Sequence, residues 1–150
     1  MWSFFLTAFL LVAADQLTKL WIRSYPAGQT IFQAGFFQIV RNQNSGAAFG
    51  LFQGQQLALT IVAILGIGLL LFYALVIRRQ FPSLDSRLTR IALGLALGGI
   101  TGNLIDRLRF GGVTDFISVG WWPAFNIADS AIVVGVIIFA YFLLSLARKH

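Results

Sequence analysis

The sequence contains no cysteine and no glutamate, and its single histidine, His150, is the last residue. Without a thiol, the chain can form neither a disulfide nor a thiolate metal site, and it has no cysteine nucleophile. One histidine at the end of the chain also argues against a Ser-His-Asp triad and against a histidine-rich metal site. We therefore expect no metal ion and no organic cofactor.

Charge is also scarce, since only 11% of the 150 residues are charged and 58% are hydrophobic. A soluble domain carries about 25% charged residues. Residues 57–77 contain no charge at all, and a helix of this length crosses a hydrocarbon core of about 30 Å. Three further segments, 2–22, 88–108 and 124–147, are nearly as apolar. We therefore predict an all-α membrane protein with four transmembrane helices in a single domain, residues 1–150.

The first apolar segment, residues 2–22, resembles a signal peptide only in its position. It has no basic stretch before it, and no A-x-A-like cleavage site leads into a soluble domain. We expect it to remain as a permanent helix.

The net charge of +6 is distributed along the loops. Arg78, Arg79, Arg87 and Arg90 flank the short connection between the second and third helices, and Arg148 and Lys149 follow the fourth. By the positive-inside rule these ends face the cytoplasm, although five other basic residues near the opposite side make the bias modest. Both termini are then cytoplasmic, and we expect membrane lipid rather than nucleic acid around the protein.

The outer connection between the first two helices contains a β-rich segment at residues 29–40, which mixes β-branched and aromatic residues around Gly35. This composition predicts two short strands or a hairpin on the membrane face. The segment RNQNSGAAFGLFQG at 41–54 follows with turn chemistry. Deletion of residues 29–40 is expected to impair any activity at this face while leaving the helices inserted.

Glycines recur every four residues in the third helix, at Gly94, Gly98 and Gly102. They share one helical face, where small side chains allow a second helix to approach closely. We interpret this face as a packing surface.

All five acidic residues are aspartates, and four of them converge on the outer half of the predicted bundle, namely Asp15, Asp106, Asp115 and Asp129. Asp15 and Lys19 are spaced i and i+4, which favours a structural salt bridge. In GNLIDR, Asn103, Asp106 and Arg107 share one helical face and suit a supporting role. Placing a carboxylate within a membrane costs free energy, so we expect Asp115 and Asp129 to have a function.

Asp115 and Asp129 have no obvious basic partner in their own helical turn. Asn126 and Asp129 are spaced i and i+3 at a helix start, where a capping role alone would explain the carboxylate. The short loop from 113 to 126 also allows Asp115 to lie close to Asp129. Two carboxylates in a poorly solvated site share a proton, which is the basis of aspartic peptidase chemistry.

Five ordered motifs resemble those of the bacterial lipoprotein signal peptidases, also called signal peptidase II. They are DQLTK at 15–19, NSGAAFG at 44–50, GGITGNLIDR at 98–107, VTDF at 113–116 and PAFNIADSAI at 123–132. The resemblance implies a four-helix membrane aspartic peptidase that cleaves a prolipoprotein signal peptide just before a diacylglyceryl-modified cysteine. It implies a bacterial inner-membrane location, and we expect the enzyme to act as a monomer.

The resemblance also implies roles for individual residues. Asp115 and Asp129 match the catalytic pair. The polar positions that line the substrate site or support the pair are matched by Asn44, Asn103, Arg107 and Asn126. Asp15 and Lys19 match a supporting pair, and Asp106 is placed in support as well.

Two other classes of function remain open from the residues alone. A small proton- or cation-coupled carrier would also keep aspartates inside a bundle, near the middle of the bilayer. A non-catalytic assembly subunit would use polar residues to bond between helices.

Overall fold

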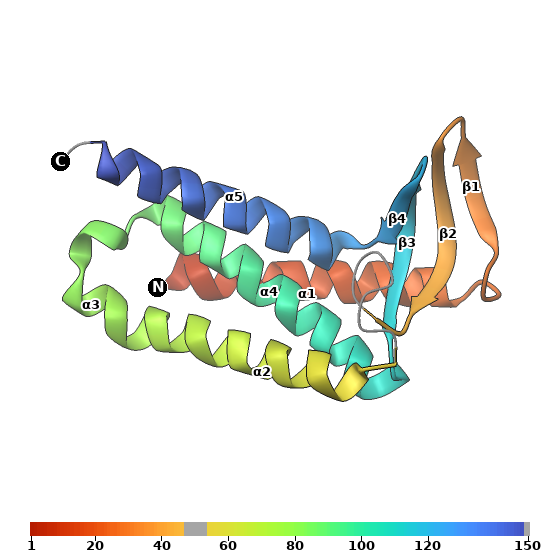
Figure 1. Cartoon of the computed structure of the whole chain (residues 1–150), viewed down its shortest axis with the longest axis horizontal. Helices are drawn as coiled ribbons and strands as arrows, with labels where there is room; N and C mark the ends of the chain where they lie inside the picture. Colours follow the sequence, from red (N-terminus) through yellow and green to blue (C-terminus); the bar gives the residue numbers. More distant parts are fainter. Residues whose placement is uncertain (47–53, 149–150) are drawn as a thin grey trace.

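The computed structural model describes residues 1–46 and 54–148 as a bundle of long helices with a small sheet at one end (Figure 1). Within these residues, four helical segments are long and apolar enough to cross a membrane: Trp2–Arg23, Gln56–Gln80, Arg87–Phe110 and Ile127–Ala147. The sheet stands at one end of the bundle, which we call the sheet end. The N-terminus and the end of the last helix lie at the opposite end. The predicted fold class is confirmed.

The helical segments agree closely with the predicted ranges. They are α1 (Trp2–Arg23), α2 (Gln56–Phe72), α4 (Arg87–Phe110) and α5 (Ile127–Ala147). The second segment runs beyond α2 through a π-helical turn, η2 (Tyr73–Ile77), into the short α3 (Arg78–Gln80). A 3-10 turn, η3 (Pro82–Leu84), then leads to α4.

Helix α4 is the centre of the bundle and packs against α1, α2 and α5. The predicted glycine face explains this close packing. A Cβ on Gly94 would lie 2.7 Å from the carbonyl oxygen of Phe4, and one on Gly98 would lie 2.8 Å from that of Ala8. On the other side, a Cβ on Gly99 would lie 2.5 Å from the carbonyl oxygen of Ala128 in α5. Larger side chains at these positions would force the helices apart.

The sheet has four antiparallel strands in the order β1-β2-β3-β4. The hairpin β1 (Thr30–Ala34) and β2 (Phe37–Asn44) lies where the sequence predicts it. The sequence does not predict the inner strand β3 (Val113–Val119) or the edge strand β4 (Trp122–Phe125), because its pattern is interpreted as a loop there. The β-rich region is therefore built from two connections, the one between α1 and α2 and the one between α4 and α5, not from the first alone.

The start of the fourth helix is also corrected. The pattern predicts a helix from Ala124, whereas α5 begins at Ile127. Ala124 and Phe125 belong to β4, and Asn126 adopts an extended conformation as the N-cap residue. Asparagine is favoured at this position because its side chain accepts a hydrogen bond from an otherwise unpaired backbone N–H.

Candidate active site

Asp115 lies in β3 at the sheet end of the bundle and is 2% exposed. Asn44 in β2 donates its side-chain amide to Oδ2 of Asp115 over 3.0 Å, and Asn126 donates to Oδ1 over 2.8 Å. Burial, and next the nearby Asp129 carboxylate, raise the pKa of Asp115 to about 7. This carboxyl group can therefore hold a proton near neutral pH.

Asp129 lies in the first turn of α5 and forms a capping box with Asn126. Its backbone N–H donates to Oδ1 of Asn126 over 2.9 Å, and its Oδ2 accepts from the backbone N–H of Asn126 over 3.1 Å. Its Oδ1 accepts from the side-chain amide of Asn103 over 2.7 Å. The capping role considered from the sequence is thus present. It leaves the carboxylate on the wall of a cavity rather than buried.

Asn126 links the two aspartates directly. Its side-chain amide binds Asp115, and its backbone N–H binds Asp129. Asn126 itself is fully buried, so its hydrogen bonds hold both carboxyl groups in fixed positions. Two carboxyl groups of different burial, held by one residue, form an arrangement suited to general acid and general base catalysis.

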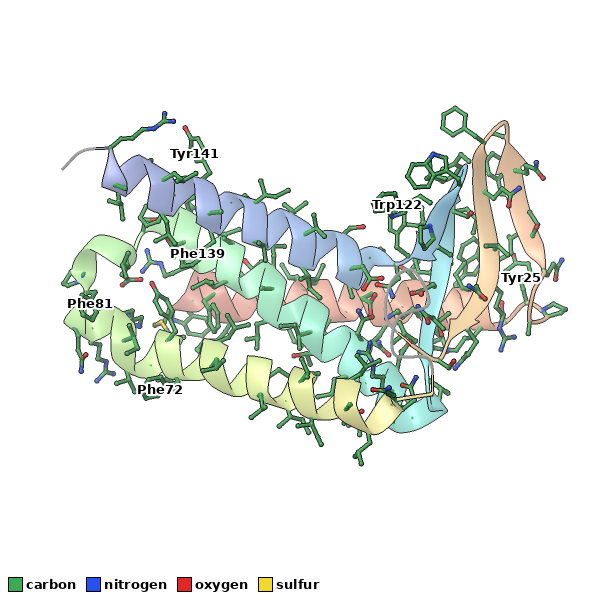
Figure 2. All side chains as sticks on the ribbon, viewed as in Figure 1. Tyr25, Phe72, Phe81, Trp122, Phe139 and Tyr141 are labelled. Carbon is green, nitrogen blue, oxygen red and sulfur yellow. The ribbon has the colours of Figure 1, made fainter. Side chains whose placement is uncertain are left out.

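Both aspartates line one cavity of about 780 Å³. Asn44, Asn103 and Arg107 line it as well. The Nε atom of Arg107 is buried and has no hydrogen-bond partner among the described residues. Arg107 therefore brings a positive charge to the wall on which the two carboxyl groups lie. Figure 2 shows nitrogen- and oxygen-bearing side chains gathered where the helices meet the sheet.

Away from the centre, the cavity becomes apolar and runs between α2 and α5. Val62 and Ala63 of α2 and Val133 of α5 line it, and Ile100 of α4 lies between them. Val62 is 65% exposed and Val133 is 57% exposed. The cavity is therefore open along the sides of two helices, toward the surroundings of the bundle.

A second polar group lies behind the aspartate pair, and we call it the buried ion cluster: Asp15, Lys19, Arg23 and Asp106. Nζ of Lys19 lies 2.9 Å from Asp15 and 3.4 Å from Asp106, while Arg23 lies 3.3 Å from Asp106. Asp15, Lys19 and Asp106 are fully buried. None of the four lines the cavity.

The predicted Asp15–Lys19 salt bridge is confirmed. Asp106 does not pair with its neighbour Arg107; it accepts from Lys19, Arg23, Gln16 and the backbone N–H of Thr114. With its oxygens occupied in this way, Asp106 is placed for support. Its bond to Thr114 also fixes the residue that precedes Asp115 in β3.

Sequence reasoning missed Gln16, Arg23 and Thr114 as members of this network. Arg23 is four residues after Lys19 and shares its helical face, so its participation could have been predicted. Thr114 and Gln16 gave no such signal, because their partners are 8 and 90 residues away along the chain. Of the quoted motifs, NSGAAFG lies largely outside the described residues, apart from its first three positions.

The described part of the chain holds no group of three or more histidine, cysteine, aspartate or glutamate side chains arranged to bind a metal ion. The aspartate pair offers two carboxylates, and the amides around it donate hydrogen bonds to them.

Comparison with known proteins gives a consistent family. The family model described as Signal peptidase (SPase) II matches residues 7–145. A lipoprotein signal peptidase from Dehalococcoides mccartyi is 50% identical over 135 residues, which cover 89% of this chain and 84% of that protein. One from Moorella thermoacetica is 44% identical over 144 residues, covering 94% of this chain and 92% of that protein.

Solved structures agree with the sequence relatives. A bacterial membrane enzyme structure determined by the in meso method at 2.3 Å resolution matches 99% of this chain and 92% of that chain, with a TM-score of 0.88 and 29% identity. A second, at 1.9 Å resolution, matches with a TM-score of 0.81 and 30% identity. The two resemblances therefore extend over nearly the whole fold, the sheet included.

Proposed function

Because the chain belongs to the signal peptidase II family, we propose that it removes signal peptides from diacylglyceryl-modified prolipoproteins, with Asp115 and Asp129 as its catalytic pair. Membership makes the protein a bacterial membrane protease of the aspartic class. The proposal adds the cleavage position, just before the lipidated cysteine, and the residues that carry out the reaction.

The observation that supports the catalytic pair is its position on a shared cavity. Asp115 and Asp129 both line the 780 Å³ space, and Asn126 hydrogen-bonds to each. Asp15 and Asp106 form ion pairs within the buried ion cluster and do not line the cavity. Asp85 pairs with Arg78 and Arg90 at the opposite end of the bundle. Two of the five aspartates thus remain for chemistry.

In the proposed reaction the pair shares one proton. Asp115 carries it in the free enzyme, consistent with its pKa of about 7. The carboxylate of Asp129 takes a proton from a water molecule, and the resulting hydroxide attacks the carbonyl carbon of the peptide bond. Asp115 gives its proton to the developing oxyanion, which becomes a gem-diol. As the C–N bond breaks, the proton gained by Asp129 passes to the leaving amine and a hydroxyl proton of the gem-diol returns to Asp115. The new chain end leaves as a carboxylic acid, and the pair again holds one proton. Arg107 also lines the cavity, and its guanidinium group would bind a substrate backbone carbonyl.

The apolar part of the cavity fits the membrane-bound part of such a substrate. A signal peptide is a helix in the bilayer, and the space between α2 and α5 is open along the exposed Val62 and Val133. We place the signal helix there, with its cleavage site at the sheet end. A substrate can then enter sideways from the lipid without leaving the membrane.

We further propose that the sheet end faces outward and that both termini are cytoplasmic. The basic residues Arg78, Arg79 and Arg87 lie at the opposite end, as the positive-inside rule requires. The sheet carries exposed aromatic residues, among them Phe36 at 74% and Trp121 at 85%, as is common at a membrane interface. One chain supplies every residue of the site, which supports a monomer as the working unit.

The direct test is cleavage by the purified protein in detergent, without added metal. We expect a diacylglyceryl-modified prolipoprotein to be cut and the mass of its product to begin at the lipidated cysteine. The same prolipoprotein without the diacylglyceryl group should be cut much more slowly. No cleavage of the modified substrate by a folded protein would disprove the proposal.

A further inference from the structure

Lys19 is a charged residue in α1 with no exposed surface and no contact with the cavity. An ammonium group has three N–H donors and no acceptor. The one of Lys19 has two carboxylates and one amide oxygen around it. Nζ lies 2.9 Å from Oδ2 of Asp15, 3.4 Å from Oδ2 of Asp106, and 2.9 Å from Oδ1 of Asn103. The first two partners balance its charge. The third is a neutral side chain that belongs to the candidate active site.

Asn103 is held in one orientation by its three hydrogen bonds. Its oxygen accepts from Lys19 and, over 3.1 Å, from the side-chain amide of Asn126. Its nitrogen donates over 2.7 Å to Oδ1 of Asp129. A flipped amide would set its NH₂ group against two donors and its oxygen against a carboxylate. Lys19 cannot accept a hydrogen bond, so it fixes which end of Asn103 faces Asp129.

We infer that Lys19 is a positioning residue for catalysis, which acts through Asn103 to keep an N–H donor on the Asp129 carboxylate. This inference rests on the proposed function. The positive charge of Lys19 also polarises the Asn103 amide, and hydrogen bonds in such chains strengthen one another in a buried site. Lys19 is therefore more than the structural partner of Asp15, although it never touches substrate.

Asp15 reinforces the same arrangement from α1. Its Oδ1 accepts from the backbone N–H of Ala128 over 3.1 Å, in the first turn of α5. A Cβ on Gly102 would lie 2.6 Å from Oδ2 of Asp15, so glycine at this position leaves room for the carboxylate. The Asp15–Lys19 pair thus holds α5 through one member and Asn103 through the other.

The test is a double-mutant cycle on turnover. Lys19→Met alone would leave two buried carboxylates with one arginine, so the paired variant Lys19→Met/Asp15→Asn is used, which keeps the cluster neutral. It is compared with wild type, with Asn103→Ala, and with the triple variant. Cleavage of the diacylglyceryl-modified prolipoprotein is followed in single turnovers with enzyme in excess, so that very slow rates remain measurable.

We expect the paired variant to be folded and to lose about 10–100-fold in kcat, by analogy with the effect of removing hydrogen-bond partners from metal ligands. KM should stay unchanged because neither residue lines the cavity. In the Asn103→Ala background, the paired change should alter kcat by less than about 2-fold, the scatter of additive effects.

Arg23→Lys is the control, because it changes a contact with Asp106 while keeping the cluster neutral, and Arg23 has no hydrogen bond with Asn103. When the control change and Asn103→Ala are combined, the fold-loss in kcat should equal the product of the two separate fold-losses. Two results would overturn the inference and leave the proposed function intact. The first is a triple variant in which the effects of the paired change and of Asn103→Ala on kcat multiply. The second is a paired variant with the kcat of the wild type. Absence of cleavage by the wild type would instead overturn the proposed function.

Discussion

At the scale of single residues, the two aspartates differ in their surroundings and so in their chemistry. Asp115 is enclosed by the sheet, while Asp129 sits in the first turn of a helix, where the helix dipole favours negative charge. A peptidase that uses a carboxyl pair needs one member as base and one as acid at the same pH. The asymmetric surroundings supply this difference.

The pH dependence of cleavage tests this difference. The pKa of Asp115 is raised from 3.8 to about 7, so its proton is lost as pH rises through about 7. We expect kcat/KM to fall above that pH because the acid of the pair is then missing. A rate that keeps rising through pH 7 and beyond would contradict this assignment.

Stability should follow the same titration. Between 3.8 and about 7 the folded protein keeps a proton on Asp115 that the unfolded chain has lost. The stabilisation is present below 3.8 and is lost as pH rises through about 7. The same purified protein should therefore unfold at lower temperature as pH rises across this window, and Asp115→Asn should remove that part of the dependence.

The sequence could predict that Asp115 and Asp129 lie close together. The connection between the third and fourth predicted helices is short, and the motifs around both residues resemble those of a known catalytic pair. The individual hydrogen bonds could not be predicted. The contact from Lys19 to Asn103 spans 84 positions, and the one from Asp15 to Ala128 spans 113. Such contacts depend on how three helices pack, and local sequence patterns carry no information about that packing.

At the scale of elements, the sheet explains how Asp115, which lies in the connection between α4 and α5, is fixed in position. Asp115 is opposite Asn42 in the β2–β3 ladder, so the hairpin between α1 and α2 positions a residue of the connection between α4 and α5. Deleting residues 29–40 would remove β1 and half of β2, and would disturb the pairing that holds Asp115. Loss of activity in that deletion would therefore not identify a separate role for the hairpin.

The strands β3 and β4 were missed although a signal exists. Val113, Thr114, Phe116, Ile117 and Val119 are residue types enriched in strands. Gly120, with a φ of 56°, then makes the turn before β4. Its shortness and its place between two predicted helices nevertheless favour a loop in a reading of the sequence alone. Helices α1, α2 and α4 were predicted well because long apolar runs give a strong local signal.

The cavity between α2 and α5 gives a prediction at this scale. Gly66 lines it, and a Cβ there would meet only Ile100, at an ordinary 3.5 Å. Gly66→Leu should therefore insert and fold but fill part of the space for the signal helix, raising KM about 10-fold if one or two kcal/mol of apolar contact is lost.

Gly68→Leu is the matched control, because Gly68 is exposed on the same helix and a Cβ there meets nothing within 4 Å. Its KM should equal that of the wild type. Equal KM values for the two variants would show that the signal helix binds elsewhere.

At the scale of the whole molecule, the fold separates two tasks. The helices α1, α4 and α5 hold the buried ion cluster and the reactive end of α5, while α2 and α5 leave a space open to lipid. Asp115 lies in β3 and Asp129 in the first turn of α5, and Figure 1 shows that this end of α5 meets the sheet. A carrier would place these carboxyl groups near the bilayer centre, so this arrangement favours the peptidase over the carrier.

The orientation of the molecule can be tested because the chain has no cysteine. Gln33 in β1 and Gln80 in α3 are both exposed and lie at opposite ends of the bundle. We expect a membrane-impermeant maleimide to label Gln33→Cys in intact cells, and Gln80→Cys only after the membrane is opened. The reverse pattern would invert the proposed orientation.

The most direct test of the central claim is an aspartate-to-asparagine series assayed on a purified, diacylglyceryl-modified prolipoprotein. Asp115→Asn and Asp129→Asn should remain folded and lose all measurable turnover. Asp85→Asn should cleave like the wild type, because Asp85 is paired at the opposite end. Asp106→Asn should be less stable but still active in its folded fraction. A folded Asp115→Asn or Asp129→Asn protein that still cleaves would contradict the assignment of the catalytic pair.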